Sequence, residues 1–214
     1  MALTRKSKKK KKPVADVIAT QASKNAVPKK LVHYHYDHKI TFPGGVTVAG
    51  SSLDNLDRFT NPDWGLYADH QWRPEWRAEF ITWRDFGLPA NYKAAAEAIM
   101  DAYEYAANGD RVEVGCHGGH GRTGVILACM GVLAGLDEKD AIAFVRRDYC
   151  SQALETSEQE WWVEWFRCYL TDDTPSAKPI DWIAELYAQK DNFPIPEPGT
   201  KIEYTVYKPG KLPL

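Results

Sequence analysis

The stretch RVEVGCHGGHGRTGVILACMGVLAG, residues 111–135, runs from an apolar segment through a glycine-rich segment into a second apolar segment. Its first five residues have the composition of a short buried strand, and the run from Thr123 to Gly135 that of a buried helix. Glycine is costly inside either element, so glycines between them mark backbone that bends unusually or approaches another group closely. The sequence therefore predicts a strand, a glycine-rich loop and a helix in succession.

A loop between a strand and the N-terminus of a helix is a typical anion-binding site. The Lys-Ser or Lys-Thr pair of nucleotide-binding loops is absent, and Cys116 and Arg122 stand there at a Cys-x5-Arg spacing. Backbone N–H groups around the sulfur would lower the pKa of Cys116 and make it a thiolate nucleophile. Arg122 is suited to bind two phosphoryl oxygens at once, and Thr123 to donate a hydrogen bond to the sulfur. The alternative is a nucleotide-binding turn with Cys116 as a small buried hydrophobe.

A second segment, WRDFGLP at residues 83–89, contains a candidate acid. A thiolate that attacks a phosphate ester needs an acid to protonate the leaving oxygen. Asp85 follows a predicted strand at 79–83 and lies beside Gly87 and Pro89, which suit a loop that closes over a bound ester. Taken alone, the segment is better explained as an ordinary acidic turn.

The patterns of the flanking segments predict further elements. We expect two short strands around the Gly44-Gly45 turn, an irregular aromatic segment at 61–76, a helix at 91–107 that ends at Asn108-Gly109, a helix that starts near Asp137, and a helix whose start is marked by the capping-box pair Thr156 and Gln159. Strands and helices in this order predict an α/β layer fold.

The chain has 214 residues, of which 44% are hydrophobic, enough for one packed domain with appendages. We expect a basic, disordered tail at 1–30, a domain at 31–170, and an extension at 171–214 with a helix near 180–190 and a strand-like stretch at 201–207. The first twelve residues of the tail contain seven basic residues and no acidic one: Arg5, Lys6 and Lys8 to Lys12. Such a tail could bind an anionic membrane or nucleic acid, or be a solvated leader without a partner.

No apolar run is long enough to cross a membrane. The cysteine usage favours a cytoplasmic protein. The cysteines, Cys116, Cys129, Cys150 and Cys168, have spacings typical of neither a disulfide framework nor a zinc site. We therefore expect reduced thiols, with a reversible disulfide to Cys116 as an alternative. The stretch HYHYDH at 33–38 fits a strand with one exposed face better than a metal site.

Three motifs, in this order, resemble those of the cysteine-dependent protein tyrosine phosphatase superfamily: the acid loop at 83–89, the loop at 116–124, and ETSEQ at 155–159, which is similar to the loop whose glutamine positions the hydrolytic water. The resemblance implies an α/β fold of the protein tyrosine phosphatase type, with a central mixed sheet flanked by helices. It also implies a phosphatase that needs no metal or cofactor and works through a cysteinyl-phosphate.

The resemblance implies Cys116 as nucleophile, Asp85 as acid, Arg122 as phosphate ligand and Thr123 as hydrogen-bond donor to the sulfur. The residues expected to bind substrate are His117, Gly118, Gly119, His120, Gly121 and Arg122.

The sequence departs from the superfamily pattern in three places. Gly115 stands where many members have His, and Arg84 where they have Pro. Glu155 stands where many tyrosine-specific members have the glutamine that positions water, so we expect Gln159 to take over that role.

The substrate is left open by the sequence. His117 and His120 occupy positions where phosphoinositide phosphatases of the superfamily carry lysines, which favours an inositol polyphosphate or phosphoinositide. If they only fill the rim of the loop, a phosphotyrosine protein or a dual-specificity substrate is the leading expectation. A catalytically weak phosphate-binding module is the second class of function.

Overall fold

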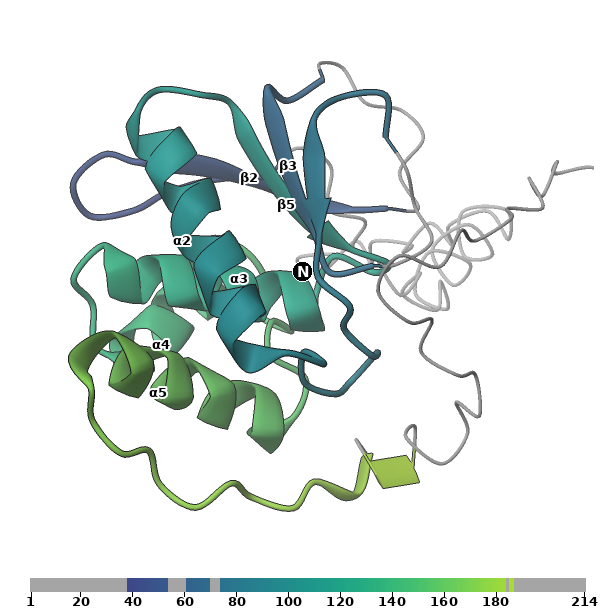
Figure 1. Cartoon of the computed structure of the whole chain (residues 1–214), viewed down its shortest axis with the longest axis vertical. Coiled ribbons are helices and arrows are strands. Elements are labelled where there is room, and N and C mark those ends of the chain that lie inside the picture. The colour runs from purple at the N-terminus through teal and green to yellow at the C-terminus, as the bar shows by residue number, and fades with distance from the viewer. Residues whose placement is uncertain (1–37, 54–60, 70–73, 184, 187–214) are drawn as a thin grey trace, which may run out of the picture. The chain divides into compact units, whose positions relative to one another are not determined.

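The structure, a computed structural model, describes residues 38–53, 61–69, 74–183 and 185–186. Its strands form one mixed sheet in the order β1-β2-β5-β3-β4 (Figure 1). They are β1 (His38–Thr41), β2 (Thr47–Ser52), β3 (Trp64–Tyr67), β4 (Ala78–Phe80) and β5 (Val112–Cys116). β1 is antiparallel to β2, whereas the β2–β5, β5–β3 and β3–β4 pairs are parallel. The carboxyl ends of these parallel strands therefore meet at one edge of the sheet.

The helices are α2 (Tyr92–Ala107), α3 (Gly121–Leu133), α4 (Glu138–Asp148) and α5 (Ser157–Thr171). Helices α2 and α3 contact the sheet directly, while α4 and α5 pack against α3 (Figure 1). The expected α/β fold with a mixed sheet flanked by helices is confirmed.

Side-chain caps explain where three of these helices begin. Asn91, Asp137 and Thr156 each accept a hydrogen bond from the backbone N–H three residues later, at the starts of α2, α4 and α5. The starts expected at Asp137 and Thr156 are confirmed. Asn108 caps the end of α2 and Gly109 follows with φ +98°, as the Asn-Gly pair predicts.

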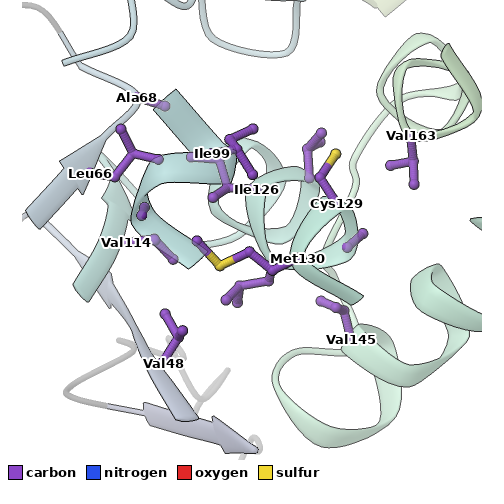
Figure 2. Packing of buried hydrophobic residues seen from close by; sticks show 14 of the residues in the cluster. Val48, Leu66, Ala68, Ile99, Val114, Ile126, Cys129, Met130, Val145 and Val163 are labelled. Atoms are coloured by element: carbon purple, nitrogen blue, oxygen red, sulfur yellow. The ribbon is translucent and has the colours of Figure 1, made fainter. Parts of the chain in front are cut away.

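The main core lies between the sheet and α3. Val48, Leu66 and Val114 come from three neighbouring strands and face Ile126 and Met130 of α3 (Figure 2). Every residue of α3 from Gly121 to Gly131 is buried, so this helix has no solvent-facing stripe. A helix buried on all sides, next to the central strand, fixes the position of the loop between them.

The other face of β5 carries a buried carboxylate. Glu113 is 1% exposed, and its Oε1 accepts a hydrogen bond of 2.7 Å from the Tyr67 hydroxyl. That hydroxyl in turn accepts one of 2.9 Å from Nε1 of Trp76. Glu113 thus lies opposite the aliphatic core, on the face to which Tyr67 also points.

Two expectations for the strands were wrong. The segment 61–76 is not wholly irregular, because it contains β3, a fully buried strand between β5 and β4. The strand expected at 79–83 is Ala78–Phe80, and Trp83 forms only an isolated bridge with Pro89. The ladder ends where the N–H of Ile81 donates to the carbonyl of Tyr67, and the chain then turns into the 83–89 loop.

Residues 1–37, including most of the HYHYDH stretch, and residues 201–207 lie outside the described residues. Where a helix was expected near 180–190, residues 182–183 and 185–186 are helical. The boundaries at 30 and 170 remain predictions. Within the described ranges, no helix combines the length and apolar character needed to cross a membrane.

Candidate active site

The loop that follows β5 is held from three sides through backbone atoms. β5 ends at Cys116 and α3 begins at Gly121, and Gly119 between them has φ +71°, a conformation that favours glycine. The N–H of Leu53 donates a hydrogen bond to the carbonyl of Cys116 (3.0 Å). The hydroxyl of Ser52 donates to the carbonyl of His117 (2.6 Å), and the hydroxyl of Tyr149 donates to the carbonyl of Gly119 (2.6 Å). With these carbonyls engaged from outside, the loop keeps a fixed shape.

Cys116 lies at the centre of the site as a free, buried cysteine, 2% exposed. The Thr123 hydroxyl, which is fully buried, donates a hydrogen bond of 3.0 Å to its Sγ. This is the contact expected from the sequence. A hydroxyl in this position stabilises a thiolate and later the sulfur as a leaving group.

The N-terminus of α3 differs from those of the other helices. His120 occupies the N-cap position but makes no side-chain hydrogen bond to the first turn, whereas α2, α4 and α5 are capped. The first amides of a helix carry partial positive charge and need acceptors. Together with Cys116 and Arg122 beside it, this end of α3 is suited to bind an oxyanion.

Arg122 joins this loop to two others. Its Nη1 donates to the carbonyl of Ala68, at the end of β3 (3.0 Å), and to that of Trp83 (3.1 Å). Its Nη2 forms an ion pair of 2.9 Å with Asp85. The guanidinium is nearly buried, and among the described residues its Nε has no hydrogen-bond partner. A buried donor left open in this way is available to a ligand.

The loop at 83–89 is folded over the site. Nε1 of Trp83 donates to the carbonyl of Gly87 (2.8 Å), which closes the loop on itself. The backbone of Phe86 is left-handed, with φ 56°, a strained conformation for an aromatic residue. Its carbonyl accepts a hydrogen bond from the hydroxyl of Thr156, the N-cap of α5 (3.2 Å). Asp85 is thereby placed beside Arg122 while its side chain stays 46% exposed.

Glu155 and Gln159 lie at the same end of α3. Glu155 is exposed at the rim, but its carboxylate reaches the backbone N–H of Gly121. Gln159 is fully buried, and its Oε1 accepts from the N–H of Glu155 (2.8 Å). Burial and the nearby Asp85 raise the pKa of Glu155, while Arg122 and the Gly121 amide oppose that shift. The water-positioning role of either residue remains a prediction.

The two histidines of the loop have different surroundings. His117 is exposed, whereas His120 is half-buried with Nδ1 3.2 Å from Sγ of Cys150. Burial raises the pKa of Cys150, so its neutral thiol can donate to that nitrogen. Gly118 lies between them at the rim, partly buried. Binding of substrate by these three residues remains a prediction.

Tyr149 and Ser52 were missed by the sequence reasoning. Burial, and then the proximity of Cys116, raise the pKa of Tyr149 well above its ordinary value, so its hydroxyl remains a donor to Gly119. Both residues lie outside the three motifs. No sequence signal marks them, because they act through backbone carbonyls of the loop.

The remaining cysteines are buried and free in the structure. Burial raises the pKa of Cys129 and of Cys168, which keeps both as neutral thiols. In the ranges that the structure describes, no group of three or more His, Cys, Asp and Glu side chains is placed to hold a metal ion.

No family model matches the chain. Two proteins of Methanocaldococcus jannaschii are similar to it in sequence: MJECL20, 40% identical over 85 residues, and MJ0215, 39% identical over 85 residues. Each match takes in 39% of this chain, and 55% and 51% of the respective relatives. The chain thus matches about half the length of these curated relatives, both of which are described as uncharacterized.

Solved structures similar to this chain include Tk-PTP in its active form, with a TM-score of 0.45 and 21% identity over 50% of this chain and 78% of that one. A mutant form of Tk-PTP has a TM-score of 0.47 and 17% identity, and the match covers 62% of this chain and 96% of that one. Kinase associated phosphatase, with its catalytic-site cysteine changed to serine, has a TM-score of 0.41 and 21% identity. The match covers 46% of this chain and 56% of that one.

Proposed function

We propose that the chain is a phosphatase that hydrolyses phosphate monoesters through a cysteinyl-phosphate on Cys116. One observation carries the proposal: Arg122, from the same loop as Cys116, is ion-paired with Asp85 of a separate loop at 2.9 Å. A thiol, an anion-binding cation and a carboxyl group therefore gather at the carboxyl edge of the sheet. These are the groups that phosphoryl transfer through a covalent intermediate requires.

In the first step, Sγ of Cys116 attacks phosphorus, the S–P bond forms and the P–O ester bond breaks. Asp85 gives its proton to the leaving oxygen. The loop amides and the guanidinium of Arg122 hold the other phosphoryl oxygens. Arg122 then binds the phosphoryl group in place of the Asp85 carboxylate.

In the second step, water attacks phosphorus and the S–P bond breaks. Asp85, now a carboxylate, accepts the proton of the water. The sulfur leaves as a thiolate that accepts the hydrogen bond of the Thr123 hydroxyl. Gln159 or Glu155 is the proposed positioning residue for the water.

The proposed substrate is a phosphorylated protein, either phosphotyrosine or dual-specificity. An inositol polyphosphate or phosphoinositide is the second candidate, favoured by the exposed His117 at the rim of the loop. A basic tail that contacts anionic membrane or nucleic acid would suit either substrate.

Turnover of an aryl phosphate by the wild type and by Cys116→Ser tests the proposal. We expect Cys116→Ser to abolish turnover and to leave oxyanion binding largely intact, because the loop amides and Arg122 are unchanged. Cys168→Ser is the matched control, a buried thiol outside the site, and should retain turnover. Hydrolysis by Cys116→Ser at the wild-type rate would refute the covalent mechanism.

A further inference from the structure

The carboxylate of Glu155 occupies part of the site where a phosphate is expected to bind. Its Oε2 lies so close to the backbone of Gly121 that a Cβ atom at position 121 would collide with it, and the Gly121 amide donates a hydrogen bond to the carboxylate. Gly121 is the first residue of α3, and the N-cap residue of that helix, His120, makes no side-chain hydrogen bond to the first turn. A side chain from a different loop therefore takes an amide of the proposed phosphate site.

The backbone holds Glu155 in this position. Its N–H donates to Oε1 of the fully buried Gln159 (2.8 Å), and the next residue, Thr156, caps α5. Nε2 of Gln159 is buried and has no hydrogen-bond partner among the described residues. The side chain of Gln159 thus fixes the backbone of Glu155, and the carboxyl group of Glu155 reaches the amide of Gly121.

The groups that face Glu155 have opposing effects on its charge. Asp85, from the acid loop, disfavours the carboxylate, while Arg122 and the Gly121 amide, from α3, favour it. The Cys150 thiol at the end of α4 also interacts with Glu155. Burial of the carboxyl group is the largest influence and acts in the same direction as Asp85, so the net effect raises the pKa of Glu155.

We propose that Glu155 takes up a proton when an oxyanion enters the 116–122 loop, so that its carboxyl group changes from a competitor for the Gly121 amide into a hydrogen-bond donor to the bound anion. The inference rests on the proposed function. A doubly charged oxyanion bound at the Gly121 amide would be repelled by the carboxylate of Glu155. A protonated carboxyl group would instead have an O–H to donate to the anion. The proton comes from solvent, and no covalent bond to phosphorus changes. Glu155 is then a positioning residue that makes phosphate binding dependent on pH.

Proton uptake on sulfate binding to the Cys116→Ser protein tests this inference. Sulfate remains a dianion between about pH 5 and about pH 8, and the Ser variant has no thiolate at position 116, so any protons taken up on binding go to other groups of the protein. Calorimetry in two buffers of different ionisation enthalpy gives the number of protons taken up. Asp85→Asn in the same background gives the share that belongs to Asp85.

We expect Glu155→Gln, in the Cys116→Ser background, to reduce the uptake by as much as one proton. The fall in sulfate affinity with rising pH should become less steep by as much as about tenfold per pH unit. Glu155→Ala, which also lacks the titrating group, must give the same reduction. Glu97→Gln is the matched control: it removes a carboxylate from an exposed pair on α2, far from the loop in sequence, and should change nothing.

Two results overturn the inference, and they can be told apart. If sulfate binds but both Glu155 variants take up as many protons as their parent, Glu155 is not the group that titrates and the proposed function is unaffected. If sulfate fails to bind the parent at any pH, the loop is not an anion site, and the proposed function fails together with the inference.

Discussion

At the scale of single residues, Arg122 is a cation that the fold has withdrawn from water. The residue is only 6% exposed, and its guanidinium is compensated by the Asp85 carboxylate and by the carbonyls of Ala68 and Trp83. A buried charge is costly unless it is paired and hydrogen-bonded. Arg122 therefore depends on the segment after β3 and on the 83–89 loop for its hydrogen bonds and its ion pair.

Replacement of Asp85 by Asn should slow the reaction according to the basicity of the leaving group. Alkyl or tyrosyl phosphates should lose about 10²–10⁴-fold in kcat/KM, the usual contribution of a general acid, while activated aryl esters should lose less. Rates measured over a series of leaving groups check this. Asp63→Asn is the control, because Asp63 is also paired with an arginine, Arg111, but outside the site. Equal losses over the whole series would indicate a structural role for Asp85.

Glu155→Gln should also change stability in a direction set by the pKa shift. Because the pKa of Glu155 is raised in the folded protein, its charged form opposes folding, and the stability that Glu155 retains at acid pH is lost as the pH rises through the raised pKa. At a pH below the ordinary glutamate pKa, the melting temperature of the Gln variant should thus be close to that of the wild type. At neutral pH it should be higher than that of the wild type. Thermal melts over this pH range check the sign, and a variant less stable at neutral pH would contradict it.

At the scale of elements, Thr156 connects α5 to the acid loop. Its side chain accepts from the N–H of Gln159 and caps the helix, while its hydroxyl donates to the carbonyl of Phe86. One hydroxyl thus both begins a helix and holds the loop that carries Asp85. The strained backbone of Phe86 lies at this contact, so the loop depends on its anchor to stay closed.

Thr156→Ala and Asp137→Ala should separate these two roles. Each removes a helix N-cap and should cost about 0.5–2 kcal/mol of unfolding free energy, measured by urea denaturation. Only Thr156→Ala should also reduce kcat, because only Thr156 contacts the acid loop. If the two variants lose turnover equally, the anchor has no part in closing the loop.

The sequence predicted elements best where a local rule determines them. The caps at Asp137 and Thr156, the end of α2 and the buried strand before Cys116 all follow from patterns of a few adjacent residues. β3 was missed because it is short and buried on both faces, so it shows no alternation. It also contains Gly65, over which the ring of Tyr67 packs, and glycine is uncommon in strands.

The central side chains of the candidate site could be predicted from the sequence, but the residues that hold them in position could not. Cys116, Arg122, Thr123 and Asp85 were predicted from spacing and from what the proposed reaction would need, and the structure pairs Thr123 with Cys116 and Arg122 with Asp85. The contact between Glu155 and Gly121 joins residues distant in the chain through a backbone amide. Amides are the same in every residue, so no sequence pattern records such a contact.

At the scale of the whole molecule, α3 is the element that the rest of the fold encloses. It contacts the sheet, α2, α4 and α5, and it is buried from its first residue to Gly131. Its N-terminus forms the proposed anion site, so the packing around its body determines the position of the site. Substitutions of buried residues in α3 should therefore act mainly by lowering the stability of the protein.

Ile126→Ala should destabilise the protein by about 2–5 kcal/mol, because Ile126 is fully buried among close-packed neighbours. Urea denaturation followed by circular dichroism measures the loss. Leu170→Ala is the control at the end of α5, where the side chain is 38% exposed, and should lose much less. Similar losses in the two variants would mean that the packing around α3 contributes little more than a half-exposed contact.

Glu113 has a consequence for how the chain selects one arrangement of its strands. Side chains of a strand alternate between the two faces of a sheet, so a slip of β5 by one residue would move the carboxylate of Glu113 in among the aliphatic side chains that face Val114. It would also remove the carboxylate from the hydroxyl of Tyr67. The register shifted by one residue is thus strongly destabilised, which favours the observed register. That register sets where Cys116 leaves the sheet.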